Sequence, residues 1–184
     1  LVNGDKLSSF PIPVDEGGEY STTPKNISVY GNNAYLCNGT GGLVCVDISD
    51  PANPFLRFWI FIPFGSVDQA AVHENKLFLA TVYYNYESTL YIYDISDPNN
   101  PVQENSISFG MGSNASGIHC NGDYLYLLSN RFMRCFRFDG SEIAEQTDYE
   151  FYGDGVSTLL PIGEGLIVGG SRQMWVISLK DPLH

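Results

Sequence analysis

One segment constrains the fold of this chain most, because it occurs twice, at residues 41–54 and 88–101. Each copy has a run of apolar residues that leads into Asp-Ile-Ser-Asp-Pro, and a second proline follows. The apolar run fits a buried strand, and proline ends a strand ladder because it has no amide hydrogen. Each copy therefore predicts a strand followed by a turn.

The residue that ends this strand recurs at a regular spacing. Asp47, Asp94, Asp139 and Ser178 are separated by 47, 45 and 39 residues, a period typical of propeller blades. A second strand, preceded by a tight turn rich in Gly, Asn and Asp, is predicted upstream of each, at residues 30–37, 73–80, 121–128 and 162–169. A further strand is predicted downstream, at residues 55–63, 102–109 and 142–152. No segment shows a sustained helical period, so we expect essentially no helix.

We therefore predict an all-β chain, residues 1–184, that forms a single β-propeller domain of four four-stranded blades. The expected blade units are residues 25–64, 65–110, 111–152 and 153–184. The last unit lacks its own fourth strand, and residues 7–14 resemble one, so we expect the N-terminal strand to complete the last blade and close the ring. Two alternatives stay open, namely two chains that share one eight-bladed ring, and an excerpt of a longer propeller.

Composition excludes several classes of protein. Hydrophobic residues make up 43% of the chain and charged residues 16%, which is unlike a disordered chain. The formal net charge of −12 repels phosphate backbones and anionic lipid surfaces, so we expect no nucleic-acid partner. The chain has no run of 18 apolar residues, so the sequence predicts no membrane span. Residues 1–5 do not resemble a signal peptide.

The chain has four cysteines, Cys37, Cys45, Cys120 and Cys135. We interpret them as free thiols in the core, although Cys37 and Cys45 lie on two arms of a predicted hairpin and could pair. No spacing resembles a zinc ribbon. His73, His119 and Cys120 would bind a metal only if they converged, and we predict no metal and no cofactor.

The segment Gly42-Leu-Val-Cys-Val-Asp47-Ile-Ser-Asp-Pro-Ala-Asn-Pro54 resembles the LVIVD-repeat family of β-propellers. The match is close in the first two repeats and loose in the last two. The resemblance implies a propeller, bacterial or archaeal, that is exported or associated with the cell surface. It implies no activity, because the motif builds a blade and a fold does not fix a function. We expect Asp47, Asp50, Asp94 and Asp97 to stabilise turns; a calcium site made from them is the alternative.

Variable loops gather on one face of a propeller, and function is usually found there. Aromatic rings stack on ligands, and the guanidinium group of arginine can donate two hydrogen bonds to one acceptor group. The candidate ligand-binding residues are therefore Tyr83, Tyr84, Tyr86, Asn114, Arg131 and Arg172. The alternative is that these tyrosines only cap blade contacts and the arginines are solvated or ion-paired. Arg137 aligns with the apolar Cys45 when residues are counted back from the strand-ending aspartate.

The sequence has no nucleophile elbow, metalloprotease motif, phosphate loop or dinucleotide fingerprint. The only candidate catalytic groups are Asp68 and Asp154, which could act as an acid–base pair on a glycoside. The leading hypothesis is a non-enzymatic binding or scaffold propeller, a monomer or ring-sharing dimer, that engages a protein, peptide or glycan. A carbohydrate-active hydrolase or lyase is the first alternative, and a structural segment of a larger surface protein is the second.

Overall fold

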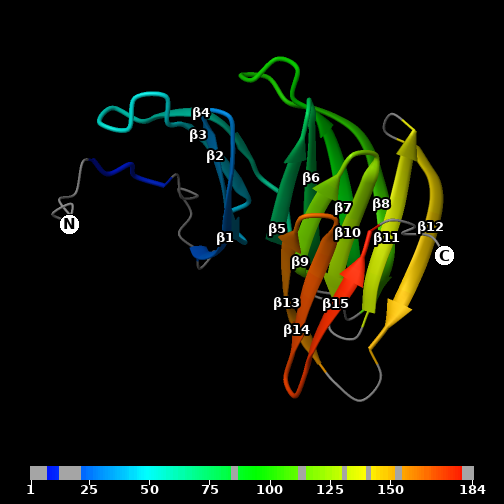
Figure 1. Ribbon diagram of the computed structural model, residues 1–184. Coiled ribbons are helices and arrows are strands. Elements are labelled where there is room, and N and C mark those ends of the chain that lie inside the picture. Colours follow the sequence, from blue (N-terminus) through cyan, green and yellow to red (C-terminus); the bar gives the residue numbers. More distant parts are fainter. Residues whose placement is uncertain are drawn as a thin grey trace, which may run out of the picture.

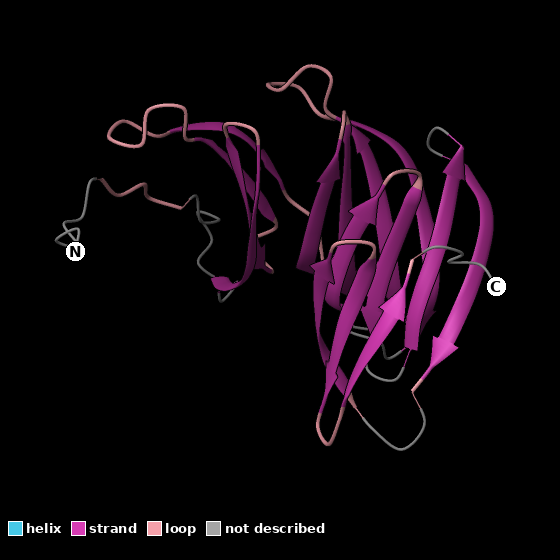
Figure 2. Cartoon of the chain, in the orientation of Figure 1, coloured by secondary structure: helices cyan, strands magenta, loops and turns pink. Residues whose placement is uncertain are grey.

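A computed structural model of the chain describes residues 8–12, 22–83, 87–111, 115–129, 132–139, 142–151 and 155–179. These residues form strands and turns, and none of them is helical (Figure 2). The strands build antiparallel meanders that follow one another in chain order (Figure 1). The all-β prediction is confirmed. In the part of the chain that is described, no helix has the length and apolar character of a membrane span.

The meanders are numbered here in chain order. The first meander comprises β1 (Thr22–Tyr30), β2 (Asn33–Gly39), β3 (Leu43–Asp47) and β4 (Phe55–Ile60). The second comprises β5 (Gly65–His73), β6 (Lys76–Tyr83), β7 (Glu87–Asp94) and β8 (Val102–Met111). The third comprises β9 (Ala115–Asn121), β10 (Tyr124–Ser129), β11 (Phe132–Asp139) and β12 (Glu142–Glu150). The fourth comprises β13 (Val156–Ile162), β14 (Gly165–Gly170) and β15 (Met174–Ser178).

The described N-terminal residues do not pair with the fourth meander, where the sequence predicted that they would. Residues 8–12, the described part of the expected strand 7–14, have no strand structure. Ser8 Oγ instead donates a hydrogen bond of 2.6 Å to the carbonyl oxygen of Pro51, in the first meander. Pro11 has no amide hydrogen to donate to a ladder, which explains why this segment makes a poor strand. Among the described strands, β15 pairs only with β14 and its other edge carries no partner.

Residues that pair directly across neighbouring strands point to the same face of a sheet. In the first meander, Tyr35 of β2 is opposite Cys45 of β3, which is opposite Phe58 of β4. The residues adjacent to them, Ala34 and Val46, point to the other face. The first meander thus has apolar residues on both of its faces.

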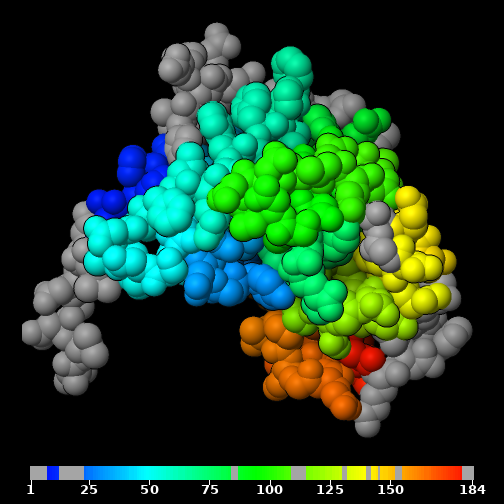
Figure 3. Space-filling view, turned by 90° about the horizontal axis from the view of Figure 1, so that it is seen from above, coloured from blue at the N-terminus to red at the C-terminus, as the bar shows by residue number. Residues whose placement is uncertain are grey.

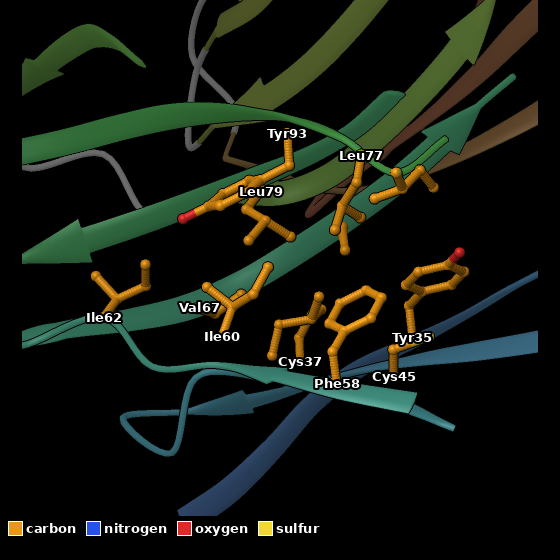
Figure 4. Close-up of a cluster of buried hydrophobic side chains, with 13 residues drawn as sticks. Tyr35, Cys37, Cys45, Phe58, Ile60, Ile62, Val67, Leu77, Leu79 and Tyr93 are labelled. Atoms are coloured by element: carbon orange, nitrogen blue, oxygen red, sulfur yellow. The ribbon is translucent and has the colours of Figure 1, made fainter. Parts of the chain in front are cut away.

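The core lies between consecutive meanders. Tyr35, Cys45 and Phe58 pack on Leu77 and Leu79 of the second meander, as Figure 4 shows. The opposite face of the second meander, with Phe78 and Ile92, packs on the third meander, and the third packs on the fourth in the same way. We call the face that packs on the next meander the trailing face, and the face that packs on the previous meander the leading face.

All four cysteines are free thiols; Cys37, Cys45 and Cys135 are buried and Cys120 is half-buried. Burial raises the pKa of each thiol, to about 12 for Cys37, Cys45 and Cys120 and to about 11 for Cys135. Such thiols are poor nucleophiles at neutral pH, because the thiolate is the reactive form. The interpretation of these cysteines as core residues is therefore confirmed.

Candidate functional site

The meanders have two edges with different chemistry. The turn edge carries the connections from β3 to β4 and from β7 to β8, which contain the Asp-Ile-Ser-Asp-Pro segments. The loop edge lies at the opposite ends of the strands, where β1 and β5 begin and β2 ends, since Gly39 of β2 pairs with both Thr22 and Val67. Among the predicted binding and catalytic residues that the structure describes, Asp68, Tyr83 and Arg172 lie at the loop edge.

Carboxylates on the turn edge are occupied by the turns themselves. Asp47 Oδ1 accepts hydrogen bonds from the amide and the hydroxyl of Ser49, and Asp94 Oδ1 accepts one from the amide of Ser96. Asp50 and Asp97 accept bonds from amides two residues ahead of them, at 3.0 Å each. Hydrogen bonds from Ser49 and Ser96 lower the pKa of Asp47 and Asp94, and the pKa of Asp50 is lowered first by a hydrogen bond from the Asn53 side chain and then by that from the Ala52 amide. The interpretation that the four carboxylates stabilise turns is confirmed.

Asp68 is the notable titratable group of the loop edge. It lies at a β-bulge in β5, between Val67 and Gln69, and only 7% of its surface is exposed. Burial raises its pKa, while a 2.9 Å hydrogen bond from Ser66 Oγ to its Oδ1 acts in the opposite direction. Asp68 therefore holds a proton to a higher pH than an exposed aspartate does.

A lysine from the first meander reaches the same place. A methyl group built on Gly39 would lie 3.6 Å from Lys25 Cε and 3.7 Å from Ser66 Oγ, so both side chains lie beside this glycine. The positive charge of Lys25 partly offsets the rise in the pKa of Asp68. The sequence analysis missed Lys25 and Ser66, because Lys25 reaches Asp68 only through packing of two meanders. Asp68 is thus part of a small charged and polar cluster with Lys25 and Ser66.

Two polar side chains at the same edge are buried without a hydrogen-bond partner among the described residues. Both side-chain atoms of Asn38, which is 1% exposed, are unpaired, and so is Ser129 Oγ, in a residue 6% exposed. Asn38 lies near the end of β2 and Ser129 ends β10, so they occupy similar places in the first and third meanders. A buried polar group without a partner costs about 1–3 kcal/mol, and such groups often mark sites where water or a ligand binds.

Only two of the predicted ligand-binding residues lie in described segments. Tyr83 ends β6, and its hydroxyl shares a hydrogen bond with that of Tyr91. Burial and this bond raise the pKa of Tyr83. Arg172 lies in the connection between β14 and β15 and lines a hollow on the fourth meander. Tyr84, Tyr86, Asn114 and Arg131, together with the candidate acid or base Asp154, lie outside the described residues.

The three candidate metal ligands do not gather at one point. His73 and Cys120 line a hollow of about 160 Å³ on the turn edge, together with Glu74, Lys76 and Asp123. His119 lines a second hollow of about 210 Å³ between β1, β5 and β9, which Cys120 also lines but His73 does not, and burial lowers the pKa of His119. The described residues include no group of three or more His, Cys, Asp or Glu side chains that could hold a metal ion.

Comparisons with known proteins agree with this architecture. The LVIVD repeat family matches residues 23–60 and 65–107, which cover the strands of the first meander and most of the second. No curated protein sequence matches the chain. Both ranges that match the LVIVD repeat family include a segment in which aspartates stabilise a turn.

Solved structures show the fold. The computationally designed Ika4 protein has a TM-score of 0.60 and 10% identity, over 94% of this chain and 99% of Ika4. The β-propeller domain of Myceliophteria thermophila Cps50 (Swd1) has a TM-score of 0.59 and 12% identity, over 85% of this chain and 54% of that one. The WD40 domain of SCAP from fission yeast has a TM-score of 0.55 and 13% identity, over 86% of this chain and 43% of that one. The fold is therefore that of a β-propeller, and this chain spans about half the length of the last two relatives.

Proposed function

Because this chain belongs to the LVIVD-repeat family and has a β-propeller fold, we propose that it is a non-enzymatic binding or scaffold propeller. In this proposal the four meanders are four blades, and the chain is exported or located at the cell surface. The loop edge engages a protein, a peptide or a glycan. Candidate contact residues are Tyr83, Tyr84, Tyr86, Asn114, Arg131 and Arg172.

The difference between the two edges carries the proposal. On the turn edge, Asp47 and Asp94 accept hydrogen bonds from Ser49 and Ser96 of their own turns, and Arg57 and Lys76 lie beside them as cations. On the loop edge, Asn38 and Ser129 are buried with unpaired side-chain atoms among the described residues. A ligand that donates and accepts hydrogen bonds gains affinity from such groups, because they have already lost their hydration. Amide, hydroxyl and peptide groups, as found on glycans and extended peptides, have this chemistry.

Binding to glycan and peptide arrays tests the proposal. The Arg172→Ala variant removes a cation from the loop edge, and Arg131→Ala removes one that the sequence predicts there. Lys76→Ala removes a cation from the first residue of β6, at the turn edge. We expect a ligand found with the unchanged protein to bind the two arginine variants at least about 10-fold more weakly, a loss of about 1.4 kcal/mol. Lys76→Ala should bind as the unchanged protein does. Equal binding by all three variants would contradict a site on the loop edge.

A carbohydrate-active hydrolase or lyase is the second candidate, and one observation favours it. The pKa of Asp68 is raised by burial, and a general acid needs a carboxyl group that keeps its proton. If Asp68 is the acid and Asp154 the base, the Asp68→Asn variant should lose hydrolysis of a glycoside but keep its binding. Turnover that is unchanged in Asp68→Asn would exclude this role.

A further inference from the structure

The trailing face of the fourth meander is apolar and exposed. Leu160 of β13 is opposite Ile167 of β14, which is opposite Val176 of β15, so the three side chains share this face. Leu160 is 59% exposed and Val176 is 69% exposed. Met174, on the same face, is 63% exposed. Most exposed strand positions are polar, so an uncovered row of this kind marks a contact surface.

The same row is buried in each of the other meanders. Val176 corresponds to Cys45, Ile92 and Cys135, which pair with Tyr35, Phe78 and Tyr126 as Val176 pairs with Ile167. All three counterparts are 0% exposed, because the next meander covers them. The fourth meander therefore carries the apolar pattern of a blade contact but no blade among the described residues covers it.

The leading face of the first meander also carries exposed apolar residues. Ile27 shares a row with Leu36, Val44 and Trp59, and Val29 shares the next row with Ala34, Val46 and Leu56. Ile27, Val29 and Leu56 are 60%, 62% and 41% exposed, whereas Ala34 and Val44, on the middle strands of this face, are buried. Their counterparts in the second meander, Ala70 and Val72, pack in the core formed with the first meander. The outer strands of this face thus carry exposed apolar residues where a preceding blade would pack.

We propose that these two surfaces are the two halves of one further blade contact, and that a second copy of this chain completes it. The trailing face of each copy packs on the leading face of the other. Two identical contacts of this kind close a ring around one axis, because a heterologous contact closes when its rotation permits. The partner is thus a copy of this chain, and each contact has the alternating apolar pattern of the three contacts within one chain.

Several observations favour a second copy over closure within one chain. Apolar residues of both surfaces stay exposed although the four meanders follow one another in an arc (Figure 3). The trailing face is also hollowed, with a volume of about 780 Å³ lined by Leu160, Ile167 and Met174. In addition, the chain covers 54% and 43% of two single-chain propeller domains, so two copies approximate one complete ring of their size.

Charge sets a condition on this assembly. Each copy carries a net charge of −12, so two copies repel one another at low ionic strength. The surfaces named above are apolar and salt does not weaken their contact. Association should therefore strengthen as salt concentration rises, whereas a contact held by ion pairs would weaken.

Sedimentation equilibrium of residues 1–184 tests the proposal. We expect a species with twice the 20.3 kDa mass of one chain. The Val29→Glu and Val176→Glu variants change one surface each, and both should weaken association by more than about 100-fold, because burying an unpaired carboxylate costs several kcal/mol. Val102→Glu is the matched control, since Val102 is 55% exposed on β8 and belongs to neither surface; this variant should remain dimeric.

Circular dichroism and thermal denaturation show whether each variant folds, and both changed valines are more than half exposed, so the fold should tolerate them. A folded protein that sediments as a single chain at every concentration would overturn the proposal. So would a result in which Val176→Glu is monomeric while folded Val29→Glu stays dimeric, because that pattern means that two trailing faces pair with each other.

Discussion

The guanidinium group of Arg57 in β4 donates a hydrogen bond to Oδ2 of Asp47, the last residue of β3. Arg57 also donates to Asn33 Oδ1 at 2.8 Å and to Asn99 Oδ1 at 3.1 Å. Asn99 belongs to a turn of the second meander, so this arginine links the two LVIVD repeats at the turn edge. The motif aspartate thus has a structural partner that its equivalent in the next repeat does not share.

Asp94, that equivalent, has Lys76 as its cation, at 3.7 Å and in a more exposed setting. We therefore expect Asp47→Ala to lower the midpoint of urea denaturation more than Asp94→Ala does. Removing Asp47 leaves the partly buried Arg57 without its carboxylate, whereas Lys76 retains Glu104 at 2.5 Å. Equal midpoints for the two variants would contradict the role given to Arg57.

Two glycines of the first repeat, Gly31 and Gly42, differ in the space around them. Gly42 has a φ angle of +81°, and a Cβ atom there would lie 2.1 Å from the carbonyl oxygen of Ile60. Gly31 also has a positive φ angle, +56°, but nothing lies within 4 Å of its missing Cβ. Gly31→Ala should thus cost about 1–2 kcal/mol for the backbone conformation alone.

Gly42→Ala must also displace β4, so its loss of unfolding free energy should exceed that of Gly31→Ala. Chemical denaturation of both variants measures the difference. A smaller loss for Gly42→Ala would mean that β4 does not approach β3 as closely as the structure has it.

Ionisation of Asp68 lowers the free energy of unfolding as pH rises, which is the opposite of the usual effect of a salt-bridged aspartate. Burial raises its pKa in the folded state, so its ionisation favours the unfolded chain. This cost is absent below the ordinary aspartate pKa of about 4 and is complete above the raised value. Asp68→Asn cannot ionise, so its unfolding free energy relative to the unchanged protein should increase as pH rises from about 4 towards neutrality.

Urea denaturation of both proteins at several pH values checks this difference. Ser66→Ala removes a hydrogen bond that favours the ionised carboxylate, and it should make the pH dependence steeper. A difference between Asp68→Asn and the unchanged protein that falls as pH rises would show that Lys25, and not burial, dominates at this site.

The sequence predicted the meanders well because the repeat has clear strand and turn signals. The predicted fourth strand of the first repeat, residues 55–63, overlaps β4, and the predicted strand at residues 102–109 lies within β8. The turn roles of Asp47 and Asp94 were also predicted correctly, because those contacts form within two residues of the aspartate. Contacts between residues so close in sequence do not depend on how the meanders pack, so the sequence alone predicts them.

Predictions that depended on register across strands were less reliable. Counting from Asp139 aligned Arg137 with Cys45, but the ladder pairs Tyr126 with Cys135 as it pairs Tyr35 with Cys45. Arg137 pairs with Tyr124 as Asp47 pairs with Asn33, so β11 continues two residues beyond this pair, to Asp139, whereas β3 ends at it. The residue at which a strand ends is among the least certain features of a prediction from one sequence.

The candidate site was predictable only in part. The sequence identified Asp68 as one carboxylate of a candidate acid–base pair, but it did not identify the neighbours Lys25 and Ser66 or the unpaired Asn38. Lys25 and Asn38 belong to the first meander and Asp68 to the second, so only packing brings these residues to one edge. Their types carry no spacing pattern that a reader of the sequence could find.

A crystal structure of residues 1–184 tests the account most directly, because it shows which surface covers each end of the array of meanders. We expect two copies around one axis, with apolar atoms of Leu160 and Val176 from one copy within about 4.5 Å of the leading face of the other. A ring closed within a single chain, with Val176 packed on the first meander of its own chain, would contradict this account.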